Sequence, residues 1–154
     1  QVDEYLNAIY RPDREYVDGV LVERAADTET QLFQALLAEY FRRYRKELRF
    51  GEYTEPRTQI IERARYRIPD LLLSPLPAGA DRVITEVPWV VVEIQSPDDR
   101  APQQWRRFRD YLSIGVRHVV LLDPEEETAF RCEPGALVET RFTDLELPTG
   151  RLPF

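Results

Sequence analysis

The sequence predicts an α/β domain in which helices flank a mixed central sheet and a β-hairpin lies towards each end of the chain. Two apolar, β-branched runs at 65–73 and 89–96 have the length and composition of buried strands. A strand, a helix and a strand follow one another between residues 89 and 122, which favours a right-handed crossover joining parallel strands. With 154 residues, 43% of them hydrophobic, we expect a single domain over residues 1–154 with a sizeable core.

The first part of the chain predicts a short helix, a hairpin and a long helix. Residues 2–8 have the apolar spacing of one or two helical turns. Asp18-Gly19 separates two strand-like runs and supplies the positive φ that a tight hairpin turn requires. Asp27 is a predicted N-cap, and the helix after it should continue to about Gly51. Its predicted apolar stripe consists of Leu32, Phe33, Leu36, Leu37, Tyr40, Phe41, Tyr44 and Leu48.

The second part of the chain predicts strands around one further helix. Residues 76–81 are a predicted loop between the two apolar runs. Pro102 suits the first turn of a helix, and Gly115 suits its C-terminal end. A buried strand at 117–122 follows, and Pro134-Gly135 marks the turn of a last hairpin.

Composition narrows the classes of protein and of site. The net charge of −7 argues against loose, non-specific adhesion to nucleic acid. No apolar run approaches the roughly 20 residues that span a bilayer, so we expect no membrane span and a cytoplasmic location. A single cysteine, Cys132, excludes an internal disulfide and a Cys-rich zinc site. The one histidine, His118, lies in an apolar run and favours a structural role.

Two acidic residues interrupt the apolar runs: Asp70 in the first and Glu93 in the second. An ionised carboxylate inside an apolar strand is costly unless it is paired, hydrogen-bonded or bound to a metal. If the two strands are neighbours, these carboxylates could hold a hard divalent cation such as Mg²⁺. The alternative is that each acid pairs with its own arginine, and the residue types alone leave both possibilities open.

Strand alternation adds a third polar side chain to this candidate site. Gln95 lies two residues after Glu93, so the two side chains should point the same way. Its amide oxygen could bind the metal or a metal-bound water. Such a metal would activate water and neutralise the charge of a phosphodiester under attack.

These residues resemble a known nuclease pattern. Ile68-Pro69-Asp70 followed by Val92-Glu93-Ile94-Gln95 is similar to the PD-(D/E)xK motif, and the longer string resembles the Uma-type putative restriction endonuclease family. The matching pieces keep their order and cover most of residues 10–142. They are Tyr16-Val17-Asp18-Gly19, Arg67-Ile68-Pro69-Asp70, the stretch 92–100, Tyr111-Leu112, Gly115-Val116-Arg117 and Leu122-Asp123-Pro124.

The resemblance implies a restriction-endonuclease-like fold and DNA cleavage that depends on Mg²⁺ or Mn²⁺, with Asp70 and Glu93 as metal ligands. The chain departs from the family pattern because Gln95 occupies the position of the motif lysine. Many members place a lysine on the following helix instead, and here that position is Arg107. Arg107 could hold a phosphate but cannot shuttle a proton, and a structural ion pair is its alternative role. Glu15 is either an acid beside the site or a surface acid, and we favour the surface.

Three functions are compatible with these residues. The first is a metal-dependent endonuclease in which Asp70 and Glu93 bind the metal while Gln95 and Arg107 assist. The second is a catalytically impaired domain of the same fold that binds DNA or a protein partner. The third is a homodimeric structural module that uses exposed aromatic side chains at its interface.

Overall fold

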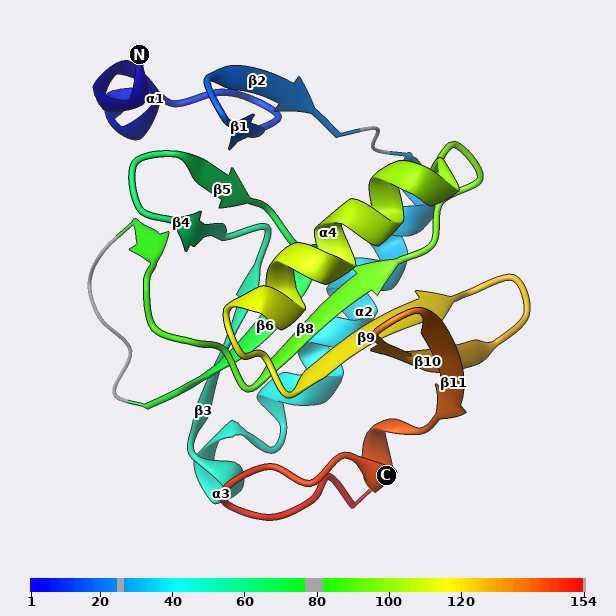
Figure 1. Ribbon diagram of the computed structural model, residues 1–154. Coiled ribbons are helices and arrows are strands. Elements are labelled where there is room, and N and C mark those ends of the chain that lie inside the picture. The colour runs from blue at the N-terminus through cyan, green and yellow to red at the C-terminus, as the bar shows by residue number, and fades with distance from the viewer. Residues whose placement is uncertain (25–26, 77–81, 154) are drawn as a thin grey trace.

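The computed structural model describes residues 1–24, 27–76 and 82–153, so most of the loop predicted at 76–81 lies outside the described residues. Figure 1 shows the order of the elements along the chain. They are α1 (Val2–Asn7), β1 (Arg14–Val17), β2 (Val20–Glu23), α2 (Thr28–Arg42), α3 (Arg45–Leu48), β3 (Phe50–Thr54), β4 (Arg57–Ile61), β5 (Arg65–Arg67), β6 (Leu71–Pro75), β7 (Val83–Ile84), β8 (Val90–Ile94), α4 (Ala101–Ser113), β9 (His118–Asp123), β10 (Thr128–Glu133), β11 (Ala136–Thr140) and the 3₁₀ turn η1 (Phe142–Asp144).

A six-stranded mixed sheet in the order β11-β10-β9-β8-β6-β3 forms the centre of the molecule. Strands β8 and β9 are parallel and are joined through α4, with Val91 opposite Val119. Strands β6 and β8 are antiparallel, with Leu72 opposite Val91. This arrangement confirms both the mixed central sheet and the strand–helix–strand crossover.

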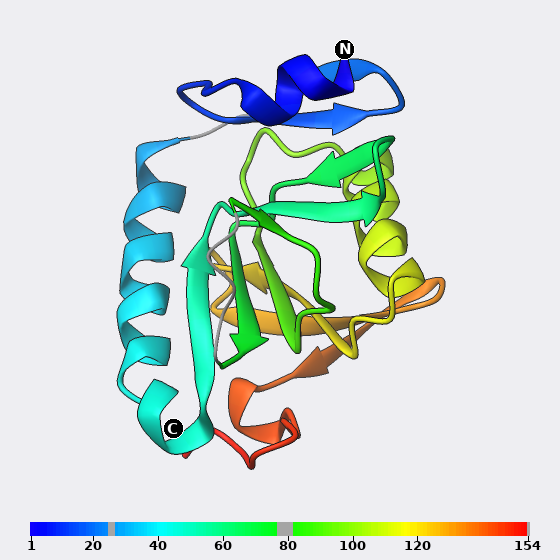
Figure 2. The ribbon, with the colours of Figure 1, turned by 90° about the vertical axis from the view of Figure 1, so that its left-hand side faces the viewer.

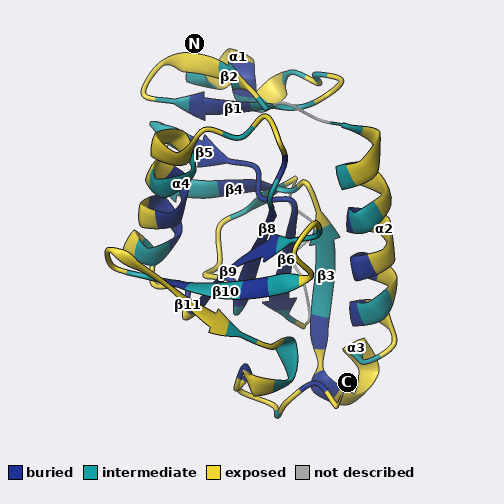
Figure 3. Cartoon of the chain, turned by 90° about the vertical axis from the view of Figure 1, so that its right-hand side faces the viewer, coloured by how far each residue is buried: buried dark blue, intermediate teal, exposed yellow. Residues whose placement is uncertain are grey.

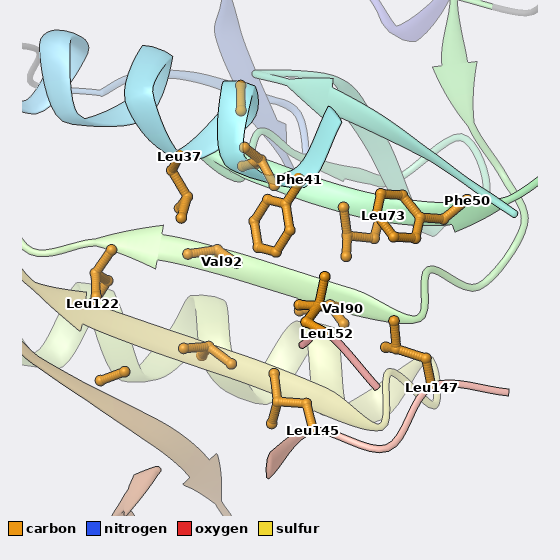
Figure 4. Close-up of a cluster of buried hydrophobic side chains, with 14 of the residues drawn as sticks. Leu37, Phe41, Phe50, Leu73, Val90, Val92, Leu122, Leu145, Leu147 and Leu152 are labelled. Carbon is orange, nitrogen blue, oxygen red and sulfur yellow. The ribbon is translucent and has the colours of Figure 1, made fainter. Parts of the chain in front are cut away.

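Helices α2 and α4 cover opposite faces of this sheet (Figure 2). Side chains of β8 alternate between the two faces, because successive residues of a strand point in opposite directions. Val90 and Val92 join the core beneath α2, whereas Val91 joins the core beneath α4. Figure 4 shows the first of these cores, in which Leu37 and Phe41 of α2 approach the sheet.

The N-terminal hairpin β1–β2 belongs to a second sheet, in the order β2-β1-β5-β4-β7. Asp18 and Gly19 have φ values of 50° and 92°, which confirms the predicted tight turn. Tyr5, Tyr16 and Tyr66 form a small buried cluster between α1 and this sheet. Near the other end of the chain β10 and β11 form the predicted second hairpin.

The expectation of one continuous strand at 65–73 is wrong. Residues 65–67 form β5 in the second sheet, and residues 71–75 form β6 in the central sheet. Pro69 has no backbone N–H and so cannot continue a hydrogen-bonded ladder. Asp70 follows it at the bend between the sheets, and its carbonyl oxygen accepts a 3.2 Å hydrogen bond from the Glu55 amide.

The expectation of one helix from Asp27 to about Gly51 is also only partly right. Asp27 caps α2 by accepting a hydrogen bond from the Thr30 amide, but α2 ends at Arg42 and the short α3 follows. Leu32 and Leu36 are 63% and 55% exposed, because the buried face of α2 is formed by Gln34, Leu37, Ala38 and Phe41. The exposed outer side of α2 is visible in Figure 3. No helix within the described ranges is long and apolar enough to cross a membrane.

Candidate functional site

Asp70 and Glu93 come together where β6 begins and β8 ends, on two inner strands of the central sheet. Leu71 pairs with Val92, and one further step in this register places Asp70 opposite Glu93. The Asp70 carboxylate accepts a 2.7 Å hydrogen bond from the Ile94 amide, which fixes it against β8. The two acids are 8% and 2% exposed. Their segments are therefore neighbours, as expected, and both carboxylates are buried.

Both carboxylates contact the same guanidinium, that of Arg24. Its Nη2 donates to Glu93 Oε2 at 2.8 Å, and its Nη1 lies 3.6 Å from Asp70 Oδ1. Nη1 also donates to the backbone carbonyl of Ile68. Arg24 follows β2 directly, so the N-terminal hairpin delivers this side chain to the sheet. The acids are thus paired by arginine, as the alternative to a metal expected, but one arginine serves both acids instead of a separate arginine for each.

Burial dominates the electrostatics of the acid pair. It raises the pKa of Glu93 from the usual 4.5 to about 7, although the Arg24 charge acts in the opposite direction. Burial likewise raises the pKa of Asp70 despite the contact with Arg24. For Arg24 burial opposes the charge, but Glu93 and Asp70 outweigh it and raise its pKa. Arg24 therefore stays protonated and favours the ionised form of both acids.

Tyr111 and Gln34 donate further hydrogen bonds to the two acidic residues. The Tyr111 hydroxyl on α4 donates to Glu93 Oε1 at 3.1 Å. Burial raises the pKa of Tyr111 well above its ordinary value, so it remains a neutral donor. Gln34 on α2 donates its amide to the Asp70 carbonyl oxygen at 2.6 Å. Side chains from both helices thus contact these strand ends.

Glu15 is not a surface acid, so that expectation is wrong. It is fully buried on β1, and its carboxylate accepts hydrogen bonds from Arg107 Nη2 at 3.0 Å and from Arg67 Nη1 at 3.3 Å. The Ile68 amide donates to its other oxygen at 2.8 Å. Burial would raise the pKa of Glu15, but Arg107 and Arg24 outweigh burial and lower it. Glu15 is therefore an ionised member of the same buried cluster.

Arg107 and Gln95 lie near the acid pair but contact other partners. Arg107 is buried on α4 and forms its salt bridge with Glu15, which is the structural alternative considered for it. Gln95 points towards α4, as Glu93 does. Its amide oxygen accepts a 3.2 Å hydrogen bond from Gln104, which lies nearer the start of α4 than Arg107. In the described parts of the chain, neither Arg107 nor Gln95 thus forms a hydrogen bond or an ion pair with Asp70 or Glu93.

Sequence reasoning identified the acids but missed Arg24, and it named Tyr111 only among the pieces that resemble the family. Val20, Val22 and Arg24 share one alternation, and this pattern gives no sign of an ion pair with residues 70 and 93. His118 has the structural role expected of it. Its Nε2 lies 2.8 Å from the carbonyl oxygen of Glu146, and the side chain is buried.

The donor atoms of the site suit a hard divalent cation, but the space is already filled. Carboxylate oxygens are the ligands Mg²⁺ prefers. Here Arg24 takes one oxygen of each acid, while the Ile94 amide and the Tyr111 hydroxyl take the others. No group of three or more His, Cys, Asp or Glu side chains across residues 1–24, 27–76 and 82–153 is arranged to hold a metal. The site therefore fits a metal only if Arg24 leaves.

Comparisons with known proteins agree with the fold and with the family resemblance. A crystal structure of a putative nuclease belonging to DUF820 from Anabaena variabilis is similar, with a TM-score of 0.76 at 20% identity over 96% of this chain and 87% of that one. This similarity confirms the restriction-endonuclease-like fold. No protein of curated function matches the sequence. The family model for Uma2, described as "Putative restriction endonuclease", matches residues 2–153. The chain therefore belongs to the Uma2 family.

Proposed function

We propose that the protein is a nuclease that hydrolyses DNA phosphodiester bonds at the Asp70–Glu93 pair. One observation carries the proposal: in a member of this family, two buried carboxylates from neighbouring segments converge on a single cation. Buried acids with raised pKa values that share one charged partner are typical of functional sites.

The roles of the chain's residues follow from their contacts. Asp70 and Glu93 would hold the ion, which is Mg²⁺ or Mn²⁺ in this proposal. When bound, such an ion supplies charge neutralisation and an activated water. The Ile94 amide fixes Asp70 and the Tyr111 hydroxyl orients Glu93. Gln95 and Arg107 would assist from beside the acid pair, with Arg107 held in position by Glu15.

A basic groove beside α4 supports DNA as the substrate. It has a volume of about 640 Å³ and lies between the β1–β2 turn, β5 and α4. Its arginines are Arg65, Arg67, Arg106 and Arg109. Asp110 pairs with Arg65 and Arg67. Arg106 and Arg109 are exposed on α4. Exposed guanidinium groups beside a groove favour contacts with a phosphate backbone. The groove reaches the acid cluster through Arg67, which also binds Glu15.

Other features of the residues around the Asp70–Glu93 pair favour a second function. Arg24 fills the position between the acids, Glu15 neutralises Arg107, and Gln95 replaces the motif lysine. A domain with these features would bind DNA or a protein partner without cleaving DNA. This is the catalytically impaired alternative.

A cleavage assay separates the two functions. Plasmid and linear DNA are incubated with the wild type, Asp70→Asn and Glu93→Gln, in millimolar Mg²⁺ or Mn²⁺ or in chelator. Asp98→Asn is the matched control, because Asp98 is an exposed acid in the segment between β8 and α4, close in sequence to Glu93. Metal-dependent cleavage that both site variants lose and Asp98→Asn retains supports the nuclease. Cleavage that ignores Asp70→Asn contradicts it, and DNA binding without cleavage favours the impaired domain.

A further inference from the structure

The guanidinium of Arg24 is held by more than charge. It contacts two carboxylates and one backbone carbonyl, and these belong to the bend before β6 and to β8. Only 14% of the Arg24 side chain is exposed, against 12% for Asp70 and 3% for Glu93. A cation in this position replaces the water that ionised carboxylates lose on burial. The position between the two acids therefore favours a positively charged group.

The charges of the buried cluster already balance. Four acids, Glu15, Asp70, Glu93 and Asp110, face four arginines, Arg24, Arg65, Arg67 and Arg107. A divalent ion added beside Arg24 would leave this buried cluster with two uncompensated positive charges. An ion that takes the place of Arg24 adds only one. Repulsion between like charges in a buried site makes the two cations mutually exclusive.

The surroundings limit where Arg24 can go when it leaves. The cavity that borders Arg24 and Asp70 measures about 30 Å³, which is room for about one water molecule and not for a guanidinium. Arg24 must therefore withdraw outward, together with the end of the N-terminal hairpin. Figures 1 and 2 show this hairpin lying across one end of the molecule, above the strands that carry the acids. Pairing of Tyr16 with Tyr66 anchors the hairpin to β5.

We propose that Arg24 is a tethered cation that competes with divalent metal for the Asp70–Glu93 pair, so that metal enters only when Arg24 withdraws. Its consequence for activity rests on the proposed nuclease function, but the competition itself does not. Removal of the Arg24 side chain should therefore create an open site with two carboxylate ligands. The hairpin that carries Arg24 thereby regulates the site.

Binding of Mn²⁺ tests the competition without any substrate. Free Mn²⁺ is measured by electron paramagnetic resonance during titration of the wild type, Arg24→Ala and Arg24→Gln in metal-free buffer. Arg57→Ala is the matched control, because it also removes a buried arginine, but the one carboxylate that it leaves unpaired, Asp13, is partly exposed. We expect millimolar or weaker binding by the wild type and by the control. Both Arg24 variants should bind at least about tenfold more tightly, and adding Glu93→Gln should abolish the gain.

Several results would overturn the proposal. Equal Mn²⁺ affinity in a folded Arg24 variant and the wild type is one. Micromolar binding by the wild type that Asp70→Asn abolishes is another, and it can be observed even if the Arg24 variants do not fold. A variant that is unfolded in chelator but folds when Mn²⁺ is added supports the competition, because the ion then replaces the missing charge.

The outcomes also separate this proposal from the nuclease function. If the Arg24 variants gain Mn²⁺ binding but no protein cleaves DNA, the nuclease function fails and the competition stands. If the wild type cleaves DNA but Arg24→Ala gains no affinity for Mn²⁺, the competition fails and the nuclease function stands.

Discussion

Replacement of Arg24 by leucine should destabilise the protein strongly. The change removes the 2.8 Å bond to Glu93, the 3.6 Å contact with Asp70 and the bond to Ile68, and it leaves two nearly buried carboxylates without a cation. Loss of one partner from a buried ion pair costs about 3–5 kcal/mol. For a chain of this size such a loss lowers Tm by on the order of 10 °C. Urea denaturation and differential scanning calorimetry near neutral pH measure both quantities.

The dependence of this loss on pH identifies its cause. Burial raises the pKa of Glu93 from 4.5 to about 7 even with Arg24 present, and removal of Arg24 should raise it further. An acid whose pKa is higher in the folded state binds more protons there than when unfolded. Stability therefore falls as pH rises from about 4.5 through the folded-state pKa. The wild type itself should lose on the order of 3 kcal/mol over this interval through Glu93.

The Arg24→Leu variant should therefore differ from the wild type little near pH 5 and fully near about pH 8. The double variant Arg24→Leu/Glu93→Gln is the control, because it buries one carboxylate fewer and should recover much of the stability near about pH 8. An equal loss at both pH values would contradict this reasoning. It would mean that packing around the Arg24 side chain, rather than an unpaired buried charge, holds the site together.

Three further predictions concern the surroundings of the pair. Tyr111→Phe removes one hydrogen bond to Glu93 and should cost about 1–3 kcal/mol in urea denaturation, while no measurable loss would show that this bond is unimportant. Glu15→Gln leaves buried Arg107 without its carboxylate and should cost about 3–5 kcal/mol, whereas an acid at the surface would cost less than about 0.5 kcal/mol. Arg106→Ala should weaken DNA binding and lower the slope of log affinity against log salt by about 1, with exposed Arg141→Ala as the control; equal slopes would exclude the α4 groove.

The parts of the fold that depend on local periodicity could be predicted from the sequence. The β8–α4–β9 crossover follows from an apolar run, an amphipathic helix and a second apolar run, each readable within a few residues. The Asp18-Gly19 turn follows from turn chemistry in the same way. The predicted burial of Leu32 and Leu36 was wrong, because periodicity shows that a helix is amphipathic but not how wide its buried face is.

In the candidate site too, local sequence patterns identified some residues, and only the tertiary fold revealed the others. Asp70 and Glu93 could be identified because an acid inside an apolar run is a local anomaly with a physical cost. Their partner could not be found this way, because Arg24 is 69 residues from Glu93 and lies in an unremarkable polar context. The prediction that Glu15 lies at the surface was wrong for the same reason, since its partner Arg107 is 92 residues away on α4. Such pairs are set by the tertiary fold, which brings the N-terminal hairpin against the sheet.

The break at the first acid has a different origin. Ile68, Pro69 and Asp70 look like part of one apolar strand, but the chain changes sheet there. Pro69 was the local signal, since it cannot donate to a central ladder. The bend has a structural consequence, because it turns the Asp70 carboxylate to the Ile94 amide and next to Glu93.

The most direct test of the cation site is a crystal structure of Arg24→Ala grown or soaked with Mn²⁺, with anomalous scattering used to locate the ion. If Asp70 and Glu93 form one cation site that Arg24 occupies in the wild type, an anomalous peak will lie between their carboxylates in the variant and be absent in the wild type under the same conditions. A well-ordered variant with no peak there, or a peak beside Arg24 in the wild type, would contradict this.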